Sequence, residues 1–188
     1  MTRSRWLPLV AFFVIAALLA AGVWMTRRPQ SDREALPSPL IGKAAPAFDL
    51  PTLHDPNRRV RSSDLRGEPY LLNVWGSWCP ACRDEHPVLT RFAETKRVRV
   101  VGYNWKDERA DALRWLEQFG NPYWLVLADI EGQTAIDLGI YGAPETFLVD
   151  KDGQVRWKHV GPLSDEVIER ELLPVLTDVE ARPMALSL

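Results

Sequence analysis

The stretch YLLNVWGSWCPACRDEH, residues 70–86, decides the fold class, because it changes from an apolar run to a helical pattern within a few residues. Tyr70–Trp75 is short and apolar, which is typical of a strand buried on both faces. From Pro80 onward the apolar residues recur at helical spacing, and a proline suits the first helical turn because its missing N–H costs nothing there. A strand therefore leads into a helix, with Cys79 and Cys82 at the junction.

Strands and helices continue to alternate towards the C-terminus. We expect further strands at 98–103, 124–128, 146–149 and 155–160, and helices at 108–119, at 134–138 and from Ser164 onward. The last two strands flank the turn sequence Lys151-Asp152-Gly153 and so predict a hairpin. Alternating elements followed by a terminal hairpin and helix predict an α/β sandwich.

Length and charge limit the classes of function. A chain of 188 residues favours one domain with accessory segments. The formal net charge of -2 and the charged fraction of 26% are those of an ordinary globular protein, without an excess of basic residues. Binding to nucleic acid is therefore not expected.

The chain has two cysteines, only three positions apart, and so short a loop would stabilise the fold little as a structural disulfide. The pair would supply half of a tetrahedral zinc site, but His54, His86 and His159 show no short paired spacing that would complete it. Covalent haem attachment needs a histidine directly after the second cysteine, where Arg83 stands. We expect neither a metal nor a cofactor, and infer that the pair serves redox chemistry.

An apolar segment lies near the N-terminus. Leu7–Met25 contains no charged residue, and its nineteen residues would form roughly 28 Å of helix, close to the thickness of a bilayer core. Basic residues bracket the run on both sides, so charge does not decide its orientation: Arg3, Arg5, Arg27 and Arg28. We interpret 7–25 as a retained transmembrane helix that anchors the protein, with a cleavable signal peptide as the alternative because small residues occur at 20–22. Either segment would send the remainder across the membrane.

Residues 26–45 carry three prolines among polar residues and no hydrophobic periodicity, which predicts a linker. The folded domain is then expected at 46–178. Residues 179–188 show no clear pattern and are expected to form a frayed tail.

Four segments carry a family resemblance: NVWGSWCPACRDEH, VVGYNWKD, GNPY and DLGIYGAPETFLVD. Together they resemble the CcmG/DsbE family of cytochrome c maturation thioredoxins, from about Ile41 to Leu176. The resemblance implies a thioredoxin-like fold, with a central mixed β-sheet flanked by helices and a family-specific insertion around 107–122. One position departs from the pattern, since Ala81 stands where relatives often have threonine.

The position of the cysteines at a helix start predicts their roles. Unsatisfied N–H groups and the positive end of the helix dipole lower the pKa of a thiol there, and Cys79 holds that position. Cys79 is therefore predicted to be the nucleophile. Cys82, inside the helix and less accessible, is predicted to resolve the mixed disulfide.

The resemblance adds residues around the pair. Trp78 would contact the partner, whereas Trp75 is expected in the core. The Ala143–Pro144 peptide bond would be cis and would face the cysteines, which leaves nearby backbone groups free to pair with a strand of the partner. Glu85 and Glu145 match acidic positions near the active site, where a carboxylate would raise the pKa of the pair; for each, a solvated surface charge is the alternative. His86, four residues after Cys82, is expected to be a surface histidine, with a position near the sulfur of Cys82 as the alternative. Tyr141 and Gly142 are expected to be loop scaffold, with contact to the partner left open. The expected binding and tuning residues are Trp78, Pro80, Glu85, Ala143, Pro144 and Glu145.

The resemblance implies a reductase of the disulfide in the CxxCH motif of apocytochrome c, acting before haem attachment. Apocytochrome c or a haem-assembly component would be one partner and a transmembrane thiol reductant the electron donor. The protein would be held in the bacterial inner membrane by the N-terminal helix, with its catalytic domain on the periplasmic side. A broader envelope reductase or oxidase remains open, because fold and motif do not set the direction of electron flow. A docking module of the haem-assembly machinery is the alternative from another class.

Overall fold

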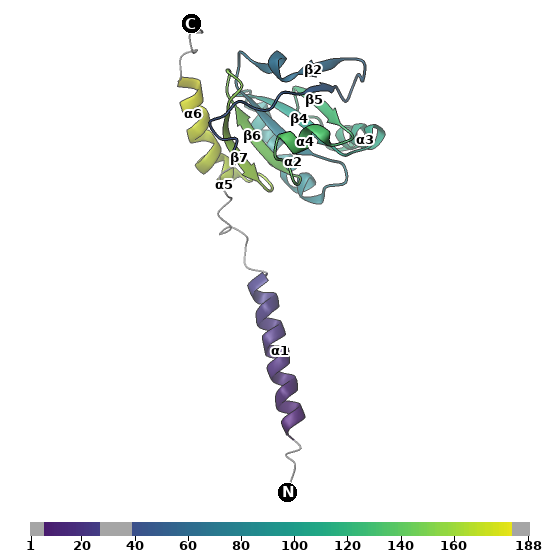
Figure 1. The fold of residues 1–188 in the computed structure, drawn as a ribbon, viewed down its shortest axis with the longest axis vertical. Helices are drawn as coiled ribbons and strands as arrows, with labels where there is room; N and C mark the ends of the chain where they lie inside the picture. Colours follow the sequence, from purple (N-terminus) through teal and green to yellow (C-terminus); the bar gives the residue numbers. More distant parts are fainter. Residues whose placement is uncertain (1–5, 27–38, 182–188) are drawn as a thin grey trace. The chain divides into compact units, whose positions relative to one another are not determined.

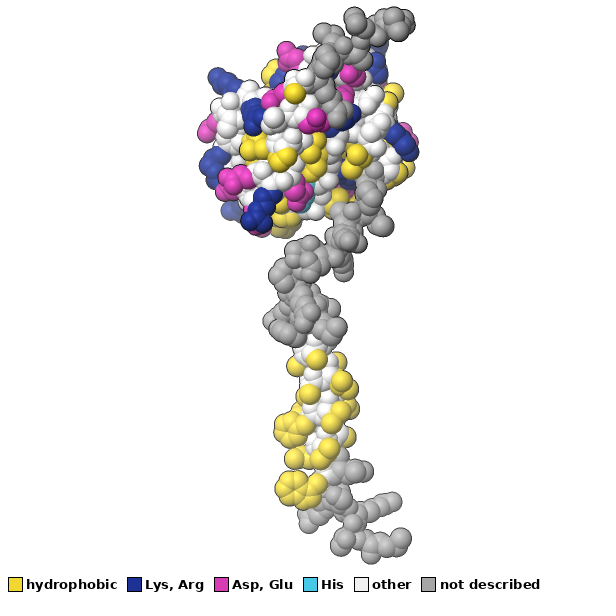
Figure 2. All heavy atoms as spheres, turned by 90° about the vertical axis from the view of Figure 1, so that its left-hand side faces the viewer, with side chains coloured by type: hydrophobic (Ala, Val, Ile, Leu, Met, Phe, Trp, Pro, Cys, Tyr) yellow, Lys and Arg dark blue, Asp and Glu magenta, His cyan; other side chains and the backbone are white. Residues whose placement is uncertain are grey.

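The computed structural model describes residues 6–26 and 39–181. The chain divides into two compact units, with the division after Leu36. The first contains helix α1 (Leu7–Thr26), whose side chains are exposed from 9 to 22 and largely hydrophobic (Figure 2). Among the helices within 6–26 and 39–181, none is identified as long and apolar enough to cross a membrane.

The second unit is built on a five-stranded sheet in the order β5-β4-β3-β6-β7 (Figure 1). Its strands are β3 (Tyr70–Trp75), β4 (Arg99–Trp105), β5 (Leu125–Asp129), β6 (Glu145–Val149) and β7 (Val155–Val160). β3, β4 and β5 run parallel, whereas β6 pairs antiparallel with both β3 and β7. This is the mixed central sheet expected from the sequence, and the terminal hairpin is confirmed.

The helices cover both faces of this sheet. They are α2 (Pro80–Glu94), α3 (Arg109–Phe119), α4 (Gln133–Asp137), α5 (Asp165–Val167), the π-helical turn η3 (Ile168–Leu172) and α6 (Leu173–Ala181). A 3-10 turn, η2 (Ser62–Leu65), follows the small ribbon of β1 (Asp49–Pro51) and β2 (Arg59–Arg61). Ser164 caps α5 by accepting a hydrogen bond from the backbone N–H of Val167, as a serine at a helix start commonly does. The α/β thioredoxin-like architecture is therefore the observed one.

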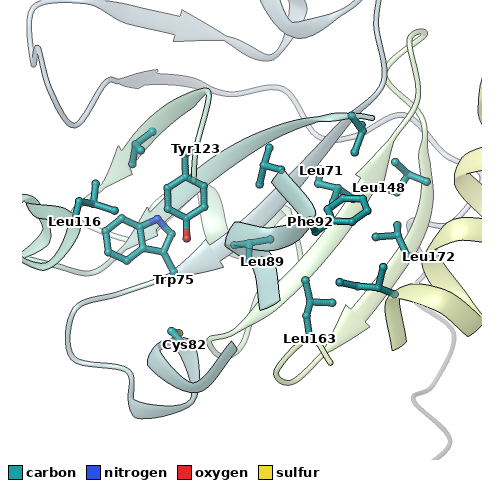
Figure 3. Close-up of a cluster of buried hydrophobic side chains, with 14 of the residues drawn as sticks. Leu71, Trp75, Cys82, Leu89, Phe92, Leu116, Tyr123, Leu148, Leu163 and Leu172 are labelled. Carbon is teal, nitrogen blue, oxygen red and sulfur yellow. The ribbon is translucent and has the colours of Figure 1, made fainter. Parts of the chain in front are cut away.

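β3 is buried along its whole length, so its side chains feed two separate cores. Leu71 and Trp75 pack with α2, α3 and α6 on one face (Figure 3), whereas Leu72 and Val74 pack on the other face with α4 and the β1–β2 ribbon. Successive side chains of a strand point to opposite faces, which is why one apolar run supplies both cores. The end of β3 and the start of α2 are thereby fixed from both sides of the sheet.

The domain extends beyond both predicted boundaries. The backbone of 42–45 pairs with the hairpin, since the N–H of Gly42 donates to the carbonyl of Val155 and the N–H of Ala45 donates to that of Gly153. α6 continues to Ala181, with Val179 buried against the core. Hydrogen bonds between backbone groups do not require hydrophobic side chains at regular spacing. The sequence of 42–45 therefore resembled that of a linker. Residues 27–38 of the expected linker and 182–188 of the expected tail lie outside the described residues.

Candidate functional site

Cys79 and Cys82 form a disulfide at the junction of β3 and α2, with their Cα atoms 5.3 Å apart. Cys79 is the N-cap of α2 and has an extended backbone, while Pro80 takes the first helical position. The backbone N–H of Cys82 donates to Sγ of Cys79 over 3.1 Å. This contact is the helix-terminus donation that would favour a thiolate at Cys79.

Access to the disulfide differs between its two sulfurs. Both cysteines are nearly covered, with 3% of Cys79 and 2% of Cys82 exposed. A groove of about 620 Å³ runs beside α2 and is lined by Ser77, Trp78, Cys79, Pro80, Arg83, Asp84, Trp115, Gln118 and Phe119. Cys79 lines this groove and Cys82 does not, so an attacking group would reach Cys79 first. Cys79 is therefore open to an attacking group on the side that faces the groove.

The two tryptophans before the motif have different environments. Trp75 is fully buried and stacks on Tyr123 with ring centroids 5.6 Å apart. Trp78 is 50% exposed, and its indole N–H donates to the backbone carbonyl of Trp105 over 3.2 Å. The first lies in the core and the second on the surface at the mouth of the groove, as the sequence predicts.

The loop before β6 closes the other side of the disulfide. The Ala143–Pro144 peptide bond is cis. The carbonyl oxygen of Ala143 lies 3.4 Å from Sγ of Cys79. The carbonyl of Pro144 accepts a hydrogen bond from the N–H of Gly161, which ties the loop to the end of β7. A partner bound through Cys79 would therefore meet this loop on one side and the groove on the other.

Glu85 lies one turn beyond Cys82 and is buried, with 2% of its surface exposed. Its carboxylate accepts hydrogen bonds from the Asn73 side-chain amide (2.9 Å) and from the backbone N–H of Leu163 (2.8 Å). Burial raises the pKa of Glu85 from 4.5 to about 7, and these two hydrogen bonds oppose the rise. The alternative of a solvated surface charge is wrong for this residue.

Asn73 joins Glu85 to a wider polar network inside the core. It accepts a hydrogen bond from the Tyr123 hydroxyl (2.9 Å) and donates one to the Thr146 hydroxyl (3.1 Å). This network was not predicted from the sequence, although one residue of the sequence indicates it. Asn73 is a polar residue in an otherwise apolar buried strand, where its amide needs partners.

Glu145 is fully buried at the start of β6 and holds the loop before it. Its carboxylate accepts hydrogen bonds from the backbone N–H groups of Tyr141 (3.0 Å) and Gly142 (3.1 Å). It also forms an ion pair with Lys158 of β7, at 2.8 Å. The alternative of a solvated surface charge is wrong for Glu145 as well, and the paired carboxylate is placed to hold the loop that carries the cis proline. Lys158 was missed because its partner lies on another strand.

His86 is buried, with 5% exposed, rather than a surface histidine as the sequence suggested. Its Nε2 lies 3.2 Å from the carbonyl oxygen of Phe119 and its ring packs edge-on against Trp115. Burial lowers the pKa of His86 from 6.5. The cause of the misprediction is α3, whose C-terminal end packs over this face of α2.

Within the described residues, 6–26 and 39–181, no group of three or more His, Cys, Asp or Glu side chains is placed to hold a metal ion. The Cys79–Cys82 disulfide gives this site the chemistry of thiol–disulfide exchange. In the reduced state, the Cys79 thiolate would attack a partner disulfide, forming a Cys79–partner bond while the second partner sulfur leaves as a thiolate. Cys82 would then attack Sγ of Cys79, re-forming the observed disulfide and releasing the partner with two more electrons and, after protonation, two thiols.

Comparison with known proteins agrees with this chemistry. The Redoxin family model matches residues 40–174. Among curated proteins, the thiol:disulfide interchange protein DsbE of Xylella fastidiosa (strain Temecula1) is 55% identical over 172 residues, covering 92% of this chain and 85% of the relative. DsbE of Pseudomonas aeruginosa is 48% identical (95% and 96% covered), and DsbE of Escherichia coli K12 is 45% identical (90% and 91% covered).

Solved structures show the same fold. A crystal structure of a Chlorobium tepidum protein is 32% identical, with a TM-score of 0.62, and covers 71% of this chain and 95% of that protein. The structure of MTB dsbF is 26% identical, with a TM-score of 0.60, over 70% of this chain and 94% of that one. The chain is a thiol:disulfide oxidoreductase and belongs to the Redoxin family, among the DsbE thiol:disulfide interchange proteins.

Proposed function

We propose that this protein reduces the disulfide in the CxxCH motif of apocytochrome c before haem attachment. In each turnover the partner's S–S bond breaks, its two cysteines become thiols, and Cys79 and Cys82 become the disulfide that the structure contains. A transmembrane thiol reductant would then return two electrons to the pair. The observation that carries the direction of electron flow is the buried carboxyl group of Glu85, one helical turn beyond Cys82 in α2.

The direction of electron flow depends on how stable the reduced form of the cysteine pair is. A strong oxidant such as DsbA owes its potential of about -120 mV to a stabilised reduced form with a thiolate. Here Glu85, one turn from Cys82, supplies a carboxyl group that does not stabilise a thiolate, and negative charge on it would oppose one. Burial lowers the pKa of His86 from 6.5 and so disfavours a positive charge on its ring. The side chains of Glu85 and His86 therefore do not stabilise a thiolate, which favours a reductant over an oxidant.

The choice of partner rests on the family. The similar proteins named DsbE and the segments that resemble cytochrome c maturation thioredoxins support apocytochrome c, or a haem-assembly component, as the protein that meets the groove beside Cys79.

We also propose that the protein is anchored in the bacterial inner membrane through residues 7–25, with the catalytic domain on the periplasmic side. The support is the uncharged apolar composition of this segment. Extraction of membranes with alkaline carbonate, followed by intact-mass measurement, tests the anchor: the protein should stay in the membrane with its N-terminal segment uncleaved. Labelling by a thiol reagent that cannot cross the inner membrane should reach the reduced pair in whole cells. A soluble protein that lacks residues 1–25 would contradict the anchor.

The test of the function is the reduction potential of the Cys79–Cys82 pair, measured against glutathione and dithiothreitol redox buffers. We expect a value well below that of DsbA, and a value near about -120 mV would contradict the reductase. A second arm measures the reduction of a disulfide-bonded CxxCH peptide against a peptide with the same cysteines and no following histidine. Equal rates would favour a general envelope reductase. Cytochrome c assembly that survived Cys79→Ser at normal protein level would favour the docking module.

A further inference from the structure

Asp107 lies just after β4, and its carboxylate is buried, with 6% of the residue exposed. It accepts hydrogen bonds from the backbone N–H of Ser77 (2.6 Å), from the hydroxyl of Ser77 (2.7 Å) and from the side-chain amide of Asn104 (2.8 Å). A buried carboxylate is costly unless several donors satisfy it, and here two of the three donors belong to one residue. That residue stands two positions before Cys79.

These bonds are directed away from the helix that Asp107 precedes. The N-cap of α3 is Glu108, which makes no side-chain capping bond, and the side chain of Asp107 accepts its hydrogen bonds from Ser77, in the segment before Cys79, and from Asn104. An aspartate near a helix start ordinarily caps its own helix. A capping role therefore does not account for Asp107, and its contacts point to the loop between β3 and α2.

The C-terminal end of β4 also holds Trp78, the residue that follows Ser77. The indole N–H of Trp78 donates to the carbonyl of Trp105, and the two rings meet edge to face with centroids 5.9 Å apart. The N–H of Cys79 itself donates to the carbonyl of Gly76 over 3.1 Å. Both residues that precede Cys79 are thus attached to 105–107, on a different strand, before the chain enters α2.

We propose that Asp107 is a positioning residue for thiol–disulfide exchange. By holding Ser77 through both its N–H and its hydroxyl, Asp107 fixes the approach of the chain to α2. That approach keeps Sγ of Cys79 in line with the N–H of Cys82 and keeps Trp78 at the mouth of the groove. The proposal rests on the exchange reaction of the Cys79–Cys82 pair and is independent of which protein is the partner.

The experiment compares the full-length reduced protein with Asp107→Ala, Asp107→Asn and a matched control, Asp111→Ala. Asp111 is an exposed aspartate of α3 that pairs with Arg114. One readout is the rate constant for reaction with the small disulfide 5,5′-dithiobis(2-nitrobenzoate), in which Cys79 forms a mixed disulfide and one nitrothiobenzoate leaves. A second readout is the pH profile of Cys79 alkylation by iodoacetamide, whose midpoint reports the pKa of the thiol and would not move if Asp107 served stability alone.

We expect Asp107→Ala to lower the rate constant at pH 7 by about tenfold, since a small misplacement of a reacting group has effects of this order or larger. The alkylation midpoint should rise, because the thiolate loses its alignment with the helix N-terminus. Asp107→Asn should stay within about threefold of wild type, because an amide oxygen can accept from the Ser77 N–H while its NH₂ donates to the Ser77 hydroxyl. The Asp111→Ala control should match wild type.

An Asp107→Ala variant that folds, with a wild-type rate constant and alkylation midpoint, would overturn the proposal. A rate increase in Asp107→Asn would also overturn it, because that result would mean that the charge of Asp107 opposes the thiolate and its geometry matters little. If Asp107→Ala does not fold, Ser77→Ala removes one of the three hydrogen bonds and should lower the rate constant about threefold. Ser77→Thr, which keeps the hydroxyl, should restore it; a Ser77→Ala variant with the wild-type rate constant would again refute the role.

Discussion

The buried carboxyl group of Glu85 should make the stability of the protein depend on pH, and Glu85→Gln should remove that dependence. The folded state raises the pKa of Glu85 from 4.5 to about 7, so at intermediate pH the folded protein binds a proton that the unfolded chain releases. The contribution of Glu85 to the free energy of unfolding is therefore fully present below pH 4.5 and is lost as the pH rises through about 7. At about 1.36 kcal/mol per pKa unit, the complete loss is about 3 kcal/mol.

The assay is urea unfolding of the oxidised protein, followed by tryptophan fluorescence at pH 5, 6, 7 and 8. Between pH 5 and pH 8 the wild-type protein should lose about 2.5 kcal/mol of unfolding free energy more than the variant. Subtracting the two profiles cancels the other titrating groups, and the readout is the pH dependence rather than the absolute stability of the variant. Parallel profiles for the two proteins would refute a buried, raised-pKa carboxyl at position 85.

Three further predictions follow from contacts at the site. Lys158→Met should lower the free energy of unfolding by about 3–5 kcal/mol, because it leaves the fully buried Glu145 without its cation. The double variant that also carries Glu145→Gln should recover part of that loss. Equal midpoints of urea unfolding for Lys158→Met and the wild-type protein would contradict the ion pair. His86 should give a pH dependence of stability opposite to that of Glu85, because burial lowers the pKa of His86 from 6.5 and the free energy of unfolding should therefore fall as the pH drops below 6.5. His86→Phe should reduce this loss of stability at acidic pH, measured by urea unfolding. An unchanged loss in the variant would exclude His86 as its source. Trp78→Ala should lower the rate of CxxCH-peptide reduction by about tenfold while changing the reaction with a small aromatic disulfide by less than about twofold, because we expect the half-exposed indole to contact the partner protein. Equal losses with both substrates would refute partner contact.

Much of the fold could be predicted from sequence because its strongest signals are local. The run Tyr70–Trp75, the proline at the first turn of α2 and the turn before β7 each specify their element through short-range chemistry. The strands of the central sheet begin and end within about two residues of those expected, whereas β1 and β2 were not expected. The start of the domain at 42–45 was missed because it depends on backbone pairing with the hairpin, which no side chain marks.

The site was predicted unevenly for a related reason. The cysteines, their place at the start of a helix and the neighbouring cis proline follow from a contiguous motif or from resemblance. The environments of Glu85, Glu145 and His86 do not, because they are made by Leu163, Lys158 and Phe119, which lie far along the chain. Burial of a charged side chain is set by what packs over it, and helical spacing alone does not reveal that cover.

The central claim is that Cys79 attacks the partner and Cys82 resolves the mixed disulfide. The most direct measurement is intact-mass spectrometry of reduced Cys82→Ser and Cys79→Ser proteins after mixing with a disulfide-bonded CxxCH peptide. Cys82→Ser should accumulate one peptide adduct, mapped to Cys79, that a small thiol removes, whereas Cys79→Ser should form little adduct because Cys82 does not line the groove. Accumulation of the adduct on Cys82 in the Cys79→Ser protein, with none on Cys79 in the other variant, would contradict the account.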